Sequence, residues 1–138
     1  MSYDLLVFAP DQAPTAREEF LSWWEKQSEW SEGHSYADPS VSTPALRNWF
    51  SEMIEAWPAM NGPFAPAEWP KDLSSMVDYS LGRSVMYTCF RWEAAEKAYT
   101  AVFAAAAKHG VGFFDASSDR GEVWLPDDKG GLVLAHSS

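Results

Sequence analysis

Residues 79–116 constrain the fold more than any other stretch, because their composition changes from that of a β-hairpin to that of a helix and back. Residues 85–92 are rich in β-branched and aromatic side chains, which suits a strand. The pair Gly82-Arg83 before them fits a two-residue hairpin loop that begins with glycine, a type II′ turn. Apolar residues at helical spacing follow, and Gly110 predicts a left-handed helix end before a return strand at 111–116.

The N-terminal part predicts one strand and two helices. Residues 3–9 are an apolar run that we interpret as the first strand. Thr15 and Glu18 match a capping box, which predicts a first helix reaching about residue 30. Thr43-Pro44 predicts the start of a second helix that ends before Pro58. The expected buried core includes Trp49, Phe50, Met53, Phe90, Tyr99 and Phe103.

The order of elements favours a single α+β domain over residues 1–138. Residues 122–125 predict a short strand, and the segment 127–138 a turn, a possible edge strand and a tail. The order is β-α-α-β-β-α-β-β, which becomes the ferredoxin-like βαββαβ unit when the second helix and last strand are omitted. We therefore expect an antiparallel sheet with helices on one face. The proline-rich run 58–78 is interpreted as a long ordered flap.

One strand raises a question that the sequence leaves open. Along residues 85–90 both alternating sets of side chains are apolar, whereas a sheet with one wet face should alternate with polar residues. Something must therefore cover the second face of the sheet. The candidates are the 58–78 flap, the second helix, or another copy of the protein.

Charge limits the class of partner. The 138 residues include 10 Lys and Arg against 20 Asp and Glu, a formal net charge of −10 with a pI near 4.6. Nucleic acid and anionic membrane surfaces attract basic proteins, so both are disfavoured as partners, and a basic protein is favoured. The N-terminus lacks the basic region of a signal peptide, and no stretch approaches the roughly 20 apolar residues of a membrane span. We expect a cytoplasmic protein.

Motifs for catalysis are not found in the sequence. It contains no phosphate-binding glycine loop, Gly-x-Ser-x-Gly, Cys-x-x-Cys or His-Glu-x-x-His. Cys89, the only cysteine, lies in an apolar strand and is expected to be a buried thiol. Glu32, His34 and Asp38 form the one polar cluster suited to metal or acid–base chemistry, but Gly33 and Pro39 disfavour a helix that would align them. We expect no catalytic residue, metal or cofactor.

Two loops instead combine acidic and aromatic residues, as protein interfaces do. The predicted partner-binding residues are Glu32, Tyr36, Asp38, Phe64, Glu68 and Trp69. The alternative, that Phe64 and Trp69 only attach the flap to the core, stays open.

Three fragments resemble parts of small bacterial proteins, some of which are similar to immunity proteins that neutralise a toxin from a neighbouring cell. They are Met1 to Leu5, Lys108 to Asp115, and Gly121 to Trp124. The resemblance implies a binding protein without catalytic residues. Our first hypothesis is an immunity-type inhibitor that occludes a basic toxin. One alternative is a ferredoxin-like dimer that encloses a small ligand or substrate between its sheets, either as a binding protein or as an enzyme. The other is a structural protein with no separable site.

Overall fold

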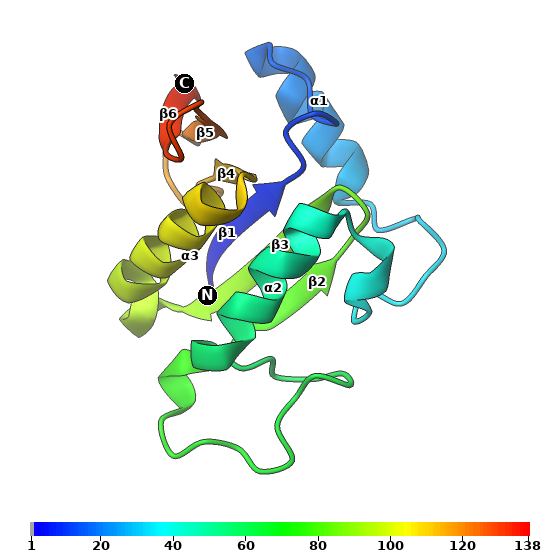
Figure 1. The fold of residues 1–138 in the computed structure, drawn as a ribbon, viewed down its shortest axis with the longest axis vertical. Helices are drawn as coiled ribbons and strands as arrows, with labels where there is room; N and C mark the ends of the chain where they lie inside the picture. Colours follow the sequence, from blue (N-terminus) through cyan, green and yellow to red (C-terminus); the bar gives the residue numbers. More distant parts are fainter. Residues whose placement is uncertain (1) are drawn as a thin grey trace.

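The computed structural model describes residues 2–138, so Met1 of the opening fragment lies outside it. The chain is an α+β protein with one open, antiparallel, six-stranded sheet in the order β2-β3-β1-β4-β5-β6, and three α-helices (Figure 1). The strands are β1 (Ser2–Phe8), β2 (Asp78–Leu81), β3 (Val85–Arg91), β4 (Gly112–Phe114), β5 (Val123–Pro126) and β6 (Leu132–His136). The helices are α1 (Arg17–Gln27), α2 (Pro44–Ala56) and α3 (Ala95–His109), with short 3₁₀ turns η1 (Pro39–Val41), η2 (Leu73–Ser75) and η3 (Trp92–Ala94).

Helices α2 and α3 cover one face of the sheet and lie side by side in Figure 1. Their apolar positions recur at helical spacing, so each helix presents one buried stripe to the strands. Gly110 ends α3 in the left-handed conformation, with a φ of 68°, as predicted. The core on this face joins Leu46, Trp49, Phe50 and Met53 of α2 and Ala98, Val102, Ala105 and Ala106 of α3 to Leu5, Val7, Met86, Phe90 and Phe113 of the sheet.

Helix α1 packs on the opposite face, so the expectation of helices on one face only is wrong. Phe20 of α1 is fully buried, and its ring centre lies 5.2 Å from that of Phe8 and 5.3 Å from that of Phe114. This second face is apolar at Leu6, Phe8 and Val85, and α1 shields it from water. The cover that the sequence left open is therefore supplied in part by the first helix, which was not among the candidates.

Local capping and turn geometry differ from the sequence interpretation at two places. Helix α1 has Ala16 as its N-cap and no side-chain capping bond, so the Thr15 and Glu18 capping box is wrong. In the β2–β3 hairpin the Gly82 amide donates to the Val85 carbonyl at 2.8 Å, which leaves Arg83 and Ser84 as the two loop residues. Gly82 has no positive φ, so a type II′ turn led by this glycine is wrong as well.

Burial of the expected core is confirmed for four residues and is incomplete for two. Trp49, Phe50, Met53 and Phe90 are buried, whereas Tyr99 and Phe103 are half-buried. Tyr99 and Phe103 pack on Phe113 with ring centres 5.2 and 5.5 Å away, and Phe103 also meets Trp124. They lie at the margin of the core, where α3 passes over the short strands β4 and β5.

The 58–77 segment leaves the core and returns to it next to β2. Ala59 forms an isolated parallel bridge with Val77, and the Met60 amide donates to the Val77 carbonyl at 2.9 Å. Between these ends the chain extends past the end of the sheet, at the bottom of Figure 1. Its base is fixed by backbone hydrogen bonds, while Met60, Phe64 and Trp69 are exposed.

Candidate functional site

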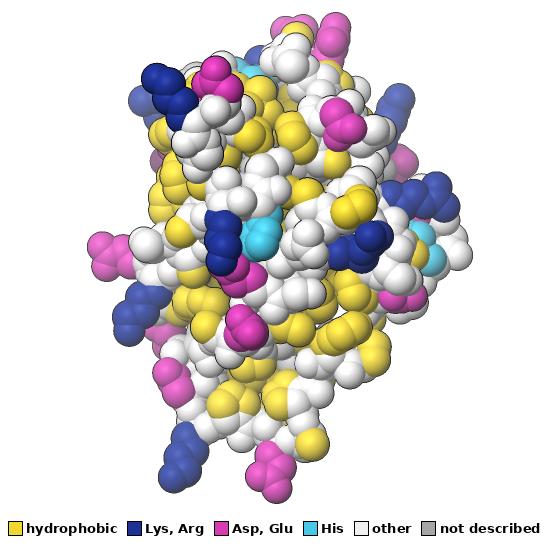
Figure 2. All heavy atoms as spheres, in the orientation of Figure 1, with side chains coloured by type: hydrophobic (Ala, Val, Ile, Leu, Met, Phe, Trp, Pro, Cys, Tyr) yellow, Lys and Arg dark blue, Asp and Glu magenta, His cyan; other side chains and the backbone are white. Residues whose placement is uncertain are grey.

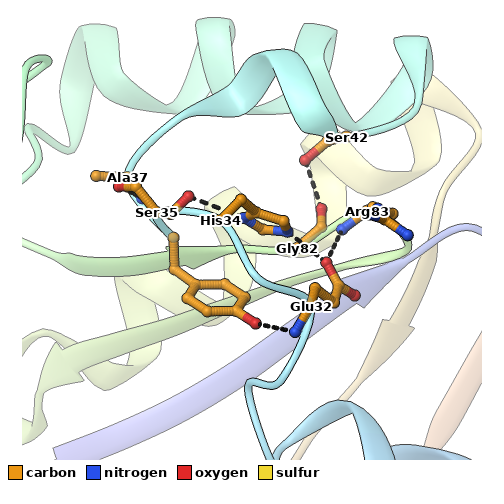
Figure 3. Close-up of polar contacts among 8 residues, drawn as sticks. Glu32, His34, Ser35, Ala37, Ser42, Gly82 and Arg83 are labelled. Atoms are coloured by element: carbon orange, nitrogen blue, oxygen red, sulfur yellow. Dashed lines mark hydrogen bonds and ion pairs between the residues drawn. The ribbon is translucent and has the colours of Figure 1, made fainter.

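The first predicted loop is bound to the β2–β3 turn (Figure 3). Glu32 Oε1 accepts hydrogen bonds from His34 Nε2 at 2.6 Å and from the Arg83 amide at 3.1 Å. The Glu32 amide donates to the Tyr36 hydroxyl at 2.8 Å, and the Tyr36 carbonyl accepts from the Leu81 amide at 2.8 Å. The structure thus brings Glu32 and Tyr36 together, and both hold the loop on the hairpin.

His34 in this loop favours its charged form. Its Nδ1 lies 2.9 Å from the Ser35 carbonyl oxygen and its Nε2 lies 2.6 Å from Glu32 Oε1. Only the imidazolium donates from both ring nitrogens at once. The bond to Ser35, and after it the bond to Glu32, therefore raise the pKa of His34.

Asp38 has a local role. Its Oδ1 accepts from the Ser40 amide at 2.9 Å and caps η1, and the hydrogen bonds from Ser40 lower the pKa of Asp38. No group of three His, Cys, Asp or Glu side chains suited to a metal occurs within residues 2–138.

The other three predicted residues lie on the exposed part of the 58–77 segment. Trp69 is 59% exposed and Phe64 is 45% exposed, and Glu68 is exposed as well. The Phe64 ring stands edge-on to Phe50, with ring centres 5.5 Å apart, so it still contacts the core. Figure 2 shows hydrophobic side chains gathered on the lower part of this face, where the segment lies.

The two predicted loops touch each other at Gly62 and Ala37. A Cβ atom built on Gly62 would lie 2.9 Å from the Ala37 Cβ, so no side chain fits between the loops there. Gly62 has a φ of 80°, which also favours glycine. The six predicted residues therefore belong to adjoining loops.

A feature that the sequence did not reveal is a groove along α2 and α3. Three adjoining cavities of about 490, 320 and 330 Å³ share Trp57 as a lining residue. We call them together the Trp57 groove. Its apolar lining includes Ala101, Ala104 and Ala105 of α3, and Asp72, Ser74 and Ser75 of the 58–77 segment border one end. Its lining carboxylates are Glu52, Glu55, Asp72, Glu93 and Glu96.

Two of these five carboxylates, Glu55 and Glu96, are free to act on a partner, because Asp72 accepts hydrogen bonds from Ser74 and the other two face cations. Glu52 pairs with Lys108 at 2.6 Å, a hydrogen bond that lowers the pKa of Glu52, and Glu93 lies 3.6 Å from Arg91. Within residues 2–138, Glu55 and Glu96 have no ion-pair partner. Lys97 is the one cationic side chain among the lining residues described. The groove therefore presents an apolar floor with an acidic rim.

The sequence contains only part of the information needed to predict the Trp57 groove. Glu52 and Glu55 are three residues apart on a helix, so they share one face, a pattern that ordinary solvated helices also show. Only the packing of α2 on α3 shows that this face borders a groove containing Trp57.

Cys89 is half-buried, so the expectation of a buried thiol is wrong. Its side chain belongs to the second face of the sheet, beside Asp4 in the β1–β3 register, outside the cluster that α1 covers. Burial first, and then the charge of Asp4, raise the pKa of Cys89 to about 12. The Tyr87 hydroxyl donates to the Asp4 carboxylate in the same row of side chains. A neutral thiol is a poor nucleophile, so this group of residues does not resemble a cysteine active site.

No protein-family model, curated protein or solved structure matches this chain. Across residues 2–138, none of the helices has the length and apolar character needed to cross a membrane. The fold and the groove define an acidic α+β protein with an apolar, acid-lined groove on the face of the sheet that α2 and α3 cover.

Proposed function

We propose that this protein is an acidic binding module that neutralises a basic, toxin-like protein by occlusion, as immunity-type inhibitors do. The observation that supports it best is the Trp57 groove, where an apolar floor is bordered by carboxylates. Aromatic anchors within an apolar patch supply affinity, and a charged rim supplies steering and specificity.

The chemistry of the groove favours a basic partner segment with one apolar side. Trp57 is half-buried and provides a large aromatic contact, while Ala101 and Ala104 allow a partner to approach the helix backbone closely. Glu55 and Glu96 would attract lysine or arginine at the rim. The exposed Phe64 and Trp69 on the bordering 58–77 segment would extend the contact in the manner of a flap.

The strand order also supports the ferredoxin-like interpretation of the first four strands. Strands β2-β3-β1-β4 are adjacent in that order, with helices between β1 and β2 and between β3 and β4. The alternative function, a dimer that encloses a small ligand between two sheets, receives less support. Such a dimer needs an open sheet face, and α1 occupies part of the second face through Phe20.

The test is affinity capture from the source cell, followed by association and dissociation kinetics at two salt concentrations. The paired change Glu55→Lys with Glu96→Lys should slow association and flatten its salt dependence. Glu18→Lys with Glu19→Lys is the matched control, because it makes the same charge change on α1, which packs against the other face.

A second variant separates anchoring from steering. Ala104 is exposed and lines the groove, so Ala104→Gln should obstruct the floor without changing the charge or disturbing the core. We expect faster dissociation and an affinity loss of about 2 kcal/mol or more, the size of a hot-spot effect. The proposal fails if no basic protein is captured, or if the groove and control variants bind equally well.

A further inference from the structure

The strand β6 is a free edge of the sheet, with one register shift against β5, where Trp124 pairs with Leu134 and Val123 with His136. It pairs with β5 on one side only and lies at the opposite end of the sheet from β2 (Figure 1). The β2 edge is partly occupied, because the Tyr36 carbonyl accepts from Leu81 and residues 58–60 run beside Val77. Free edges present unpaired backbone groups that readily bind another strand, and most proteins protect them with charges or bulges.

The free backbone groups of β6 can be assigned from the ladder. The Asp127 amide donates to the Gly131 carbonyl at 2.9 Å, which closes the β5–β6 turn. Because hydrogen-bonded and non-hydrogen-bonded pairs alternate in antiparallel strands, Val133 directs its backbone groups to β5. Leu132 and Leu134 therefore direct theirs away from the sheet.

The side chains of β6 are equally suited to contact. Val133 is 47% exposed and Leu134 is 48% exposed, and the strand sequence Leu-Val-Leu-Ala-His contains no Asp, Glu, Lys or Arg. On a protein with a net charge of −10, this is an edge that a second acidic molecule can approach without facing carboxylates on the strand itself.

The turn before β6 has a net negative charge, whereas two arginines and one exposed acid, Asp119, lie near its other end. The turn contains Asp127, Asp128 and Lys129, which together have a net charge of −1. Asp128 is exposed. At the other end, an Arg120 guanidinium nitrogen lies 3.5 Å from Ser137 Oγ, and Arg17 lies 3.2 Å from His136 Nδ1. Neither arginine has an acidic side chain within ion-pair distance in residues 2–138.

We infer that β6 pairs antiparallel with β6 of a second copy of this chain, about a two-fold axis near Leu134. Antiparallel pairing sets the start of one strand beside the end of the other. The acidic turn of each copy, with Asp128, then meets the basic end of the other, with Arg120. The contact is self-complementary, as a two-fold interface requires, and it joins two six-stranded sheets into one.

The contact is small, which sets the expected affinity. Two five-residue strands bury less than the roughly 1,200 Å² at the low end of stable interfaces. We therefore expect a concentration-dependent dimer with a dissociation constant between about 1 μM and 1 mM.

The experiment is sedimentation equilibrium of the full chain over concentrations up to about 1 mM, at fixed salt. Leu134→Pro removes an amide that faces away from β5, so it should weaken the dimer at least tenfold while the monomer stays folded. Leu134→Thr retains the amide and a strand-forming side chain, and should stay within a few-fold of the native protein.

A charge exchange gives a test that does not depend on the proline variant folding. Asp128→Arg alone and Arg120→Glu alone should each dimerise weakly, because like charges meet at both ends of the contact. Mixed in equal amounts, the two variants should associate again, since every Arg then faces an acid. Absence of self-association at about 1 mM, or a dimer that these changes leave unaltered, overturns the inference.

Discussion

Truncation of Phe20 tests the most consequential feature of the fold, the packing of α1 on the second face of the sheet. Phe20 is the one fully buried side chain of α1, and its ring contacts Phe8, Trp23, Phe114 and His136 with ring centres 5.2 to 5.7 Å away. Replacing a buried Phe by Ala costs about 3–5 kcal/mol, from lost transfer energy and the cavity left behind. No other α1 side chain is buried deeply enough to compensate.

The loss is large compared with the whole free energy of unfolding, about 5–15 kcal/mol for a domain. With a urea slope of about 2 kcal/mol per M, a loss of about 4 kcal/mol lowers the unfolding midpoint by roughly 2 M. Urea titration followed by tryptophan fluorescence and by far-ultraviolet circular dichroism measures this shift. Two probes also show whether α1 detaches before the rest of the protein unfolds.

The matched control is Leu21→Ala on the same helix. Leu21 is 37% exposed, so its truncation should change stability by no more than about 0.5 kcal/mol. A double-mutant cycle of Phe8→Leu and Phe20→Leu should give a coupling of about 0.5–1.5 kcal/mol for the ring pair. A Phe20→Ala loss below about 1 kcal/mol, or equal to that of Leu21→Ala, would falsify the placement of α1.

Three further predictions follow from single residues. Phe103→Ala should cost about 2–3 kcal/mol in urea unfolding, less than Phe20→Ala because Phe103 is half-buried; a larger loss would show that the α3 margin is part of the main core. The pKa of His34 is raised in the folded protein, so its contribution to the free energy of unfolding is complete below about pH 6 and declines as pH rises through the folded-state pKa. His34→Gln should remove this pH dependence from the free energy of unfolding. Identical stability profiles against pH for the variant and the native protein would contradict the Glu32 contact. Cys89 should react slowly with a maleimide near pH 7 and faster toward its pKa of about 12; Asp4→Asn should speed the reaction, and an unchanged rate would show that Asp4 does not act on the thiol.

Local patterns in the sequence determined most of the elements. The periodicity of α2, the glycine end of α3 and the β-branched residues of β3 each act within a few residues, so no knowledge of the rest of the chain is needed. The edge strand expected within 127–138 corresponds to β6, a sixth strand that the predicted order β-α-α-β-β-α-β-β did not include. The prediction of a turn that begins at Gly82 was wrong because the β2–β3 hydrogen-bond ladder continues through Gly82. The loop residues are therefore Arg83 and Ser84.

The tertiary structure alone decided which surfaces meet. An apolar stripe on α1 predicts that one side of this helix is buried. Both faces of the sheet are apolar, so the sequence does not indicate on which face the helix packs. Glu32 and Tyr36 appeared free because their partners, Arg83 and Leu81, lie more than forty residues away along the chain. The Trp57 groove depends on the space between two helices, which is set by their packing and not by either helix alone. The spacing of apolar residues along the sequence predicts which side chains are buried. The path of the chain in three dimensions determines which residues those side chains contact.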